Sequence, residues 1–193
     1  IFAGIHQESA GFKDPVNLVF KTEKGLNEDV VRQISHWKNE PDWMLKFRLR
    51  ALEQFKRHHY PSWGPDLSDL DLEDLYYYAR PSEKMERSWE DVPDDIKNTF
   101  DRLGVPEAER KFLAGVGAQY ESEMVYHSIQ EQLAEQGIIF LSIEDGLRQH
   151  PEIFKEYFAK AVPITDNKFA ALNSAVWSGG SFVYIPKGVK VDL

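Results

Sequence analysis

The chain contains no cysteine. This absence excludes disulfide bonds, thiolate nucleophiles and thiolate metal ligands from its 193 residues. It also favours a reducing compartment, since disulfides belong mainly to secreted proteins. No apolar run approaches the roughly 20 residues that a membrane helix needs, and the first residues lack the basic and apolar regions of a signal peptide. We therefore expect a cytoplasmic protein that has no membrane association.

Basic residues are also scarce. Lys and Arg number 23 against 32 Asp and Glu, which gives a formal net charge of −9. This balance argues against nucleic-acid binding, because phosphate contacts rely on clustered basic side chains. Residues 66–95 are strongly acidic, whereas the stretch from Lys46 to Arg57, which includes Arg48, is locally basic. Two explanations stay open: complementary surfaces within the fold, or a docking face for a partner protein.

Helix signals dominate from residue 26 onward, after an N-terminal arm with room for one strand. Asn27 is a good N-cap, and the acids Glu28 and Asp29 suit the positive end of a helix dipole. A second helix is expected to bury an apolar stripe and to end near His58. Proline, capping residues and apolar spacing predict the starts of the other helices, at Pro41, Pro93, Pro106, about residue 121, Ser142 and Asn167.

Short apolar runs predict strands at Ile138–Leu141 and Ser181–Ile185, and an alternating pattern predicts another at Val189–Leu193. A turn at Pro186–Gly188 separates the last two. A strand at the end of the chain would leave an unpaired edge, which folded proteins normally cover. We therefore expect this chain to be the front portion of a longer protein.

The clearest apolar period predicts a helix over about 121–136, with Val125, Ile129 and Leu133 on one face and Gly137 as its stop. Four potential metal ligands follow one another at i+4 spacing on such a helix: Glu123, His127, Glu131 and Glu135. This ridge would face away from the core, and di-iron carboxylate proteins space Glu and His three residues apart instead. A solvated helix face is the favoured interpretation, and a metal-dependent enzyme using Glu123, His127 and Glu131 is the remote alternative.

No catalytic constellation is evident elsewhere. Gly115–Gly117 is a lone G-x-G that follows a helical signal, whereas dinucleotide binding requires a preceding strand. Ser178–Ser181 lacks the G-x-S-x-G of a nucleophile elbow, and we expect its glycines to turn the chain from helix into strand. His58 and His59 are expected to cap a helix or to face solvent. We assign no catalytic, cofactor-binding or metal-binding residue and expect no enzyme activity.

Longer stretches of the chain are similar to one known family. They are Gly25–Val30, Asn39–Leu45, Phe47–Leu52, Leu103–Glu109, Leu113–Val116, Gln119–Glu123, Val125–His127, Asp166–Phe182 and Tyr184–Val189. In these segments the chain resembles the SufB family, the scaffold proteins of the Suf iron–sulfur cluster assembly system. The paralogous SufD family is the nearest alternative, and the sequence of Asn173–Gly180 resembles SufB more closely than SufD. A freestanding protein-binding module is a further alternative.

The resemblance implies an α+β fold, in which a helical N-terminal domain leads into the first strands of a truncated right-handed parallel β-helix. On this basis residues 1–25 form an arm, 26–163 the helical domain, and 164–193 a helix with the first β-helix strands. The resemblance also implies work in a complex with the SufC ATPase and SufD, and sulfur supply by a cysteine desulfurase and a sulfur-transfer protein. An Fe–S cluster, and any flavin, would belong to the full-length protein. The compartment would be the cytoplasm, or the plastid in a photosynthetic eukaryote.

Overall fold

The computed structural model describes residues 18–67, 69–81, 92–103, 115–120, 122–129 and 131–191. The chain divides into two compact units. The first, called the helical unit, consists of Phe20–Ala79 and Ile143–Gly179. The second, called the strand unit, contains the described residues of Ile1–Val19, Arg80–Ser142 and Gly180–Leu193. The boundaries expected near residues 25 and 163 stay predictions.

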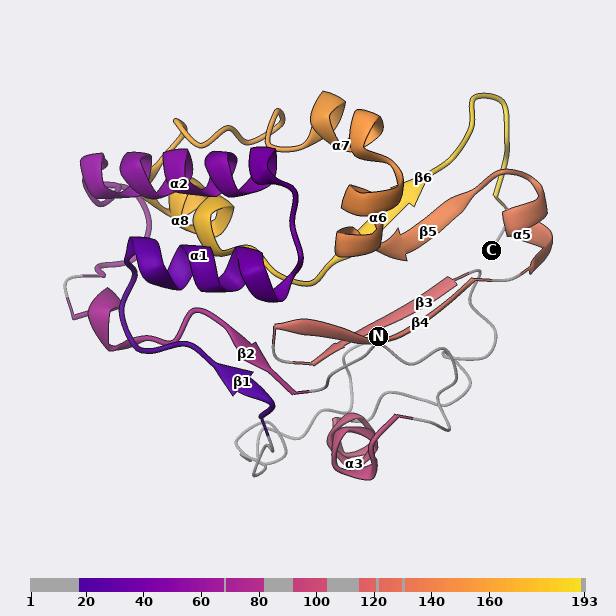
Figure 1. Ribbon diagram of the computed structural model, residues 1–193, viewed down its shortest axis with the longest axis horizontal. Helices are drawn as coiled ribbons and strands as arrows, with labels where there is room; N and C mark the ends of the chain where they lie inside the picture. The colour runs from indigo at the N-terminus through magenta and orange to yellow at the C-terminus, as the bar shows by residue number, and fades with distance from the viewer. Residues whose placement is uncertain are drawn as a thin grey trace. The chain divides into compact units, whose positions relative to one another are not determined.

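Three helices that lie side by side form the centre of the helical unit: α1 (Glu28–Trp37), α2 (Asp42–Arg57) and α8 (Lys168–Val176) (Figure 1). Its helices and strand are β1 (Phe20–Lys21), α1 (Glu28–Trp37), α2 (Asp42–Arg57), the 3₁₀ turn η1 (Leu72–Asp74), α6 (Ile143–Gln149), α7 (Pro151–Tyr157) and α8 (Lys168–Val176). Strand β2 (Ala79–Arg80) pairs with β1. Helix α8 packs along α2, and its buried Ala171 and Ala175 join Val31, Ala51 and Phe55 in one hydrophobic core. Segments from both ends of the chain therefore form a single core.

The predicted starts of α1, α2 and α8 are confirmed. The Asn27 side chain accepts a hydrogen bond from the Val30 N–H at 2.9 Å, as an N-cap should. Asn167 does the same for α8, with bonds from the N–H groups of Phe169 at 2.8 Å and Ala170 at 3.0 Å. Helix α2 follows Pro41 directly and ends at Arg57, next to the predicted end.

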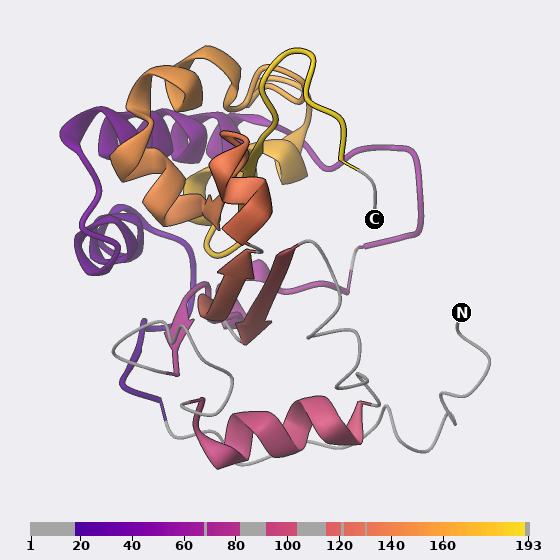
Figure 2. The same cartoon turned by 90° about the vertical axis from the view of Figure 1, so that its right-hand side faces the viewer.

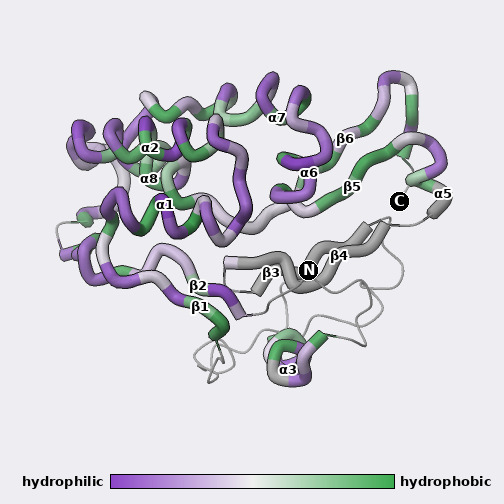
Figure 3. The backbone as a smooth tube through the Cα atoms, viewed as in Figure 1, coloured by the Kyte–Doolittle hydropathy of each residue, from purple (hydrophilic) through white to green (hydrophobic). Residues whose placement is uncertain are grey.

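The strand unit contains α3 (Asp94–Arg102), β3 (Gly115–Tyr120), β4 (Glu123–Ile129), α5 (Glu131–Glu135), β5 (Ile139–Ser142) and β6 (Ser181–Tyr184). Strands β3 and β4 form an antiparallel hairpin, and β5 pairs antiparallel with β6, with Ile139 opposite Tyr184. Figure 2 shows α3 along its length. In Figure 3, β5 is a continuous hydrophobic run, whereas hydrophilic and hydrophobic residues alternate along α1 and α2. These elements confirm the predicted strands at Ile138–Leu141 and Ser181–Ile185.

The prediction of a helix over residues 121–136 is wrong. Residues 123–129 form strand β4 in the antiparallel hairpin, and only Glu131–Glu135 is helical. Val125 and Ile129, which suggested a helix, are four residues apart, and that spacing places two residues on one face of a strand as well as of a helix. The partner strand decides between the two periods. The stop at Gly137 is confirmed, because this residue follows α5 with a φ of 80°.

The strand predicted at the end of the chain is also wrong for the residues that the structure describes. Val189–Val191 form no strand, and the Val189 N–H closes the predicted Pro186–Gly188 turn on the Pro186 carbonyl at 3.1 Å. The predicted arm up to residue 17, the Gly104 stop and the helix from Pro106 lie outside the described residues. The α+β class is confirmed, whereas the parallel β-helix stays a prediction. No described helix is both long enough and apolar enough to cross a membrane.

Candidate functional site

Arg48, in the middle of α2, is completely buried. Its guanidinium donates to both carboxylate oxygens of Glu40, from Nε to Oε2 at 2.8 Å and from Nη2 to Oε1 at 2.6 Å. It also donates to the main-chain carbonyls of Ala175 at 3.0 Å and Trp177 at 2.9 Å. Its Cζ lies 4.4 Å from the centre of the Trp177 ring, a cation–π contact. One arginine therefore connects α2, the turn before α2 and the end of α8.

The end of α8 needs such a partner. The last carbonyls of a helix have no partner within it, and the negative end of the helix dipole favours a nearby cation. Helix α8 has no basic residue in its own last turn. Arg48 supplies both the hydrogen-bond donors and the positive charge from the neighbouring helix.

A second buried ion pair reaches the chain just after α8. The Lys38 ammonium lies 2.7 Å from Oε1 of Glu144, and the two side chains are only 1% and 9% exposed. The same Glu144 oxygen accepts a hydrogen bond from the Gly179 N–H at 2.9 Å. The Arg148 guanidinium donates to the Lys38 carbonyl at 3.3 Å. Helix α6 is thus bound both to the turn after α1 and to Gly179.

The short turn between α1 and α2 brings the two ion pairs together. Lys38 caps α1, Asn39 has a left-handed φ of 50°, and the Glu40 N–H bonds back to the Ser35 carbonyl at 3.1 Å. Asparagine tolerates this conformation better than most residues. The reversal at Asn39 places Lys38 and Glu40 in two separate buried pairs. We call Lys38, Glu40, Arg48 and Glu144 the anchor network.

The anchor network holds the end of α8, where the chain passes on toward β6. Gly179 and Gly180 follow with φ of 67° and 118°, conformations that favour glycine. The Trp177 ring packs 5.3 Å from the Phe158 ring and 6.1 Å from the Phe154 ring. The expected turn from helix to strand at Ser178–Ser181 is confirmed. Because the four charges pair among themselves, this arrangement fixes the chain and offers no reacting group.

Helix α2 receives a matching contact from α8. The Lys168 ammonium donates to the carbonyls of Phe55 at 2.9 Å and His58 at 3.1 Å, at the end of α2. It also lies 4.0 Å from the centre of the Phe55 ring. Burial lowers the pKa of Lys168. His58 is the C-cap residue of α2, which confirms the capping position expected from the sequence.

Two expectations about charged residues change. Arg48 is not part of a basic surface, because it is buried in the anchor network. The proposed metal-binding ridge loses its helix, since Glu123 and His127 belong to β4 and Glu131 begins α5. Among the described residues, no group of three potential ligands is placed to hold a metal ion. The remote alternative of a metal-dependent enzyme therefore loses the helical ridge on which it was based.

The anchor network was missed from sequence, although one signal of it was present. Met44, Arg48, Ala51 and Phe55 recur at helical spacing, so Arg48 falls within the apolar stripe of α2. A charged residue on a core-facing stripe is almost never buried without a partner. The identity of that partner could not be read from the pattern. Lys38 and Glu144 gave no comparable signal.

Comparisons with known proteins agree with the sequence resemblance at the level of the family. A family model described as the SufBD protein N-terminal region matches residues 31–193. An iron–sulfur cluster assembly SufBD family protein of Staphylococcus aureus (strain USA300) is 58% identical over 182 residues, covering 94% of this chain and 39% of that protein. A protein of the same description from Staphylococcus haemolyticus (strain JCSC1435) is 59% identical, with the same coverage. The chain spans about two fifths of the length of these relatives.

Proposed function

The chain belongs to the SufBD family, and from this premise we propose that it is the N-terminal segment of a SufB-type scaffold on which iron–sulfur clusters are assembled. Support comes from the family match and from the SufB-like sequence of Asn173–Gly180. The cluster is the cargo of the complete protein. Its ligands, and any flavin, belong to residues outside this chain, which supplies no thiolate. The segment itself catalyses no reaction.

The complete protein acts in this proposal with two other Suf proteins, the SufC ATPase and SufD. Sulfur reaches it from a cysteine desulfurase through a sulfur-transfer protein, in the cytoplasm. These partners follow from the resemblance to SufB. The relatives bear on this only through their description as iron–sulfur cluster assembly proteins.

The anchor network is the observation that carries the role of this segment. Buried ion pairs with satisfied hydrogen bonds favour one arrangement of the chain, because alternatives leave charges unpaired in the interior. Arg48 and Glu144 each bind a main-chain group at the end of α8, the Trp177 carbonyl and the Gly179 N–H respectively. We assign this segment two tasks. It is a rigid frame for the chain that follows α8, and it offers docking surface, with the acidic residues 66–95 as the candidate.

Co-expression of the complete protein with SufC and SufD of the same organism tests this function. A SufB-type scaffold co-purifies with both proteins and assembles a cluster when iron, cysteine and a desulfurase are supplied without oxygen. A protein that takes the place of SufD, and pairs with SufB instead, belongs to the paralogous type. A protein that binds neither SufC nor the second scaffold protein contradicts the proposed function.

A further inference from the structure

The side chain of Lys168, at the start of α8, has only uncharged partners among the residues that the structure describes. Its ammonium donates to the main-chain carbonyls of Phe55 at 2.9 Å and His58 at 3.1 Å. It lies 4.0 Å from the centre of the Phe55 ring and 5.3 Å from the centre of the Tyr60 ring. This surrounding satisfies hydrogen bonds but supplies no counter-charge.

The absence of a counter-charge distinguishes Lys168 from lysines that form ion pairs. Lys24 pairs with Asp74, and Lys38 pairs with Glu144 in a place where it is only 1% exposed. For Lys168, burial lowers the pKa, because the uncharged amine loses less on leaving water than the ammonium does. A larger fraction of this side chain is therefore the amine, which is the nucleophilic form of a lysine.

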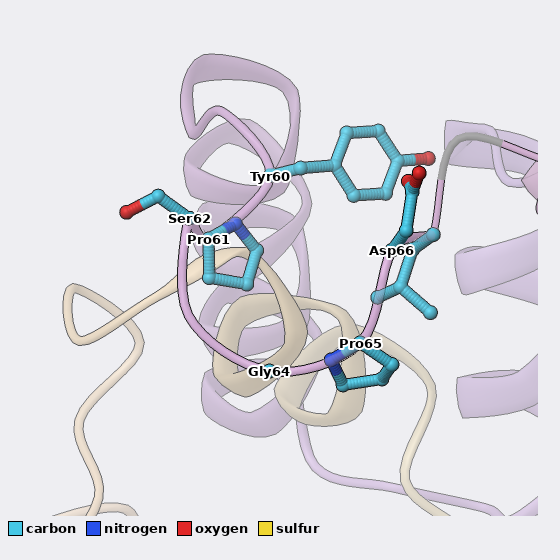
Figure 4. A pocket seen from close by; sticks show the side chains of 7 residues that line it. Tyr60, Pro61, Ser62, Gly64, Pro65 and Asp66 are labelled. Carbon is cyan, nitrogen blue, oxygen red and sulfur yellow. The ribbon is translucent and has the colours of Figure 1, made fainter.

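The contacts of Lys168 suit a reacting amine. A neutral amine has two N–H donors and one lone pair, so both carbonyls can keep their hydrogen bonds while the lone pair stays available. The site is also accessible, because Lys168 is half-buried and the neighbouring Tyr60 is 46% exposed. Tyr60 projects from the loop after α2 and lines an open pocket of about 460 Å³ (Figure 4). This pocket leaves room for a small reagent beside the Tyr60 ring.

We propose that Lys168 is a site of acylation by a small acyl phosphate, and that acylation loosens the contact between α2 and α8. The Nζ lone pair attacks the acyl carbon and forms an N–C bond, the C–O bond to phosphate breaks, phosphate leaves with the bonding electrons, and the nitrogen releases a proton to water. The product is an uncharged amide with a single N–H. One of the two carbonyls at the end of α2 then loses its donor, and the helix end loses its cation. This modification adds a covalent control to the frame and does not depend on the proposed function.

The direct test treats the full chain with acetyl phosphate at pH 8 and follows the acetylation of each lysine by mass spectrometry of its peptides. Lys56 is the matched comparison, because it lies in the last turn of α2 and is exposed, so that access alone would make it react faster. We expect Lys168 to react at least about threefold faster than Lys56, because its lowered pKa leaves more of it as the amine. In denaturant the two lysines should react at similar rates. Lys56 reacting as fast as Lys168 in the folded chain refutes the site.

Hydrogen exchange at the end of α2 measures the consequence of acetylation. The His58 amide donates to the Gln54 carbonyl at 2.9 Å, and its exchange should accelerate by about fivefold in the acetylated chain, because a hydrogen bond and a charge that hold this helix end are lost. Lys168→Arg is the control, since arginine keeps the charge and the donors and is not acetylated under these conditions. Treatment should leave the exchange of this variant unchanged. Unchanged exchange in a wild-type chain acetylated at Lys168, or equal acceleration in treated Lys168→Arg, overturns the proposed control.

Discussion

The guanidinium of Arg48 and the carboxylate of Glu40 make two hydrogen bonds in a place where neither side chain is exposed to solvent. The same guanidinium reaches the Ala175 carbonyl, 127 residues along the chain. In return Lys168, the first residue of α8, binds the carbonyls at the end of α2. Helices α2 and α8 therefore cap one another. This mutual capping explains how segments from opposite ends of the sequence form one core.

Replacing Arg48 should cost much of the stability of the helical unit. Arg48→Met leaves the Glu40 carboxylate buried without a partner, and we expect the free energy of unfolding to fall by about 3–5 kcal/mol. Urea denaturation followed by circular dichroism measures the change. Arg57→Met is the control, because Arg57 pairs with Glu53 on the surface at 3.9 Å, and its cost should stay below about 1 kcal/mol.

The double variant Arg48→Met with Glu40→Gln separates the charge effect from the loss of packing. Removing the buried carboxylate as well should recover part of the stability, because an uncompensated charge no longer remains in the core. A double variant less stable than Arg48→Met alone would contradict this account of the pair.

Glu144→Gln should loosen the chain at Gly179. The substitution leaves the Lys38 ammonium without its counter-charge in a site where it is 1% exposed, so we expect a loss of about 3 kcal/mol. Hydrogen exchange of the Gly179 amide gives a local readout, and it should accelerate more than exchange at Val31 in the core. Glu53→Gln, an exposed acid on α2, is the control. Equal protection of Gly179 in wild type and Glu144→Gln would show that this carboxylate does not hold the turn.

The two asparagine caps should contribute similarly. Asn27→Ala and Asn167→Ala each remove acceptors for the first N–H groups of a helix, and each should lower the free energy of unfolding by about 1 kcal/mol. Asn98→Ala, inside α3, is the comparison, because alanine is favoured over asparagine within a helix and no cap is lost. Thermal unfolding of the three variants distinguishes the positions. A loss at Asn98 as large as at Asn27 would contradict the capping role.

Tyr77 should make the free energy of unfolding depend on pH in the alkaline range. Burial, together with the nearby Glu73 carboxylate, raises the pKa of Tyr77 to about 12, and its hydroxyl donates to the Leu72 carbonyl at 2.7 Å. The unfolded chain releases this proton near pH 10. The stabilisation is therefore complete below pH 10 and is lost as the pH rises from 10 to 12.

Tyr77→Phe removes this titration and so isolates it. The urea midpoints of wild type and Tyr77→Phe should converge or cross as the pH is raised from 9 toward 11.5. The lowered pKa of Lys168 acts in the opposite direction below its usual 10.5, but it is common to both proteins and cancels in the difference. A constant difference between the two midpoints across this range would rule out a raised pKa at Tyr77.

Features encoded by neighbouring residues could be predicted from the sequence. The cap at Asn27, the start of a helix at Asn167, the stop at Gly137 and the glycine turn after α8 depend on the chemistry of a few adjacent residues. The hairpin of β3 and β4 could not, because the spacing of Val125 and Ile129 fits both a helix and a strand and the partner strand is needed to decide.

The anchor network was not predicted, because its bonds span long distances in the sequence. Lys38 and Glu144 are 106 residues apart, and nothing in their local sequence marks them as partners. The place of Arg48 on the apolar stripe of α2 is a local signal that could have indicated a buried charge, but it was not recognised from the sequence. The resemblance is confirmed at the level of the SufBD family, and it identified none of these contacts.

In the proposed function, this segment frames a cluster scaffold without binding the cluster itself. The most direct measurement is anaerobic reconstitution with iron and sulfide, on this chain and on the complete protein in parallel, with iron, sulfide and visible absorption determined after desalting. We predict that the complete protein retains a cluster and that this chain stays at the background of a protein without cluster. A stoichiometric cluster on this chain alone would contradict the proposed function of this segment.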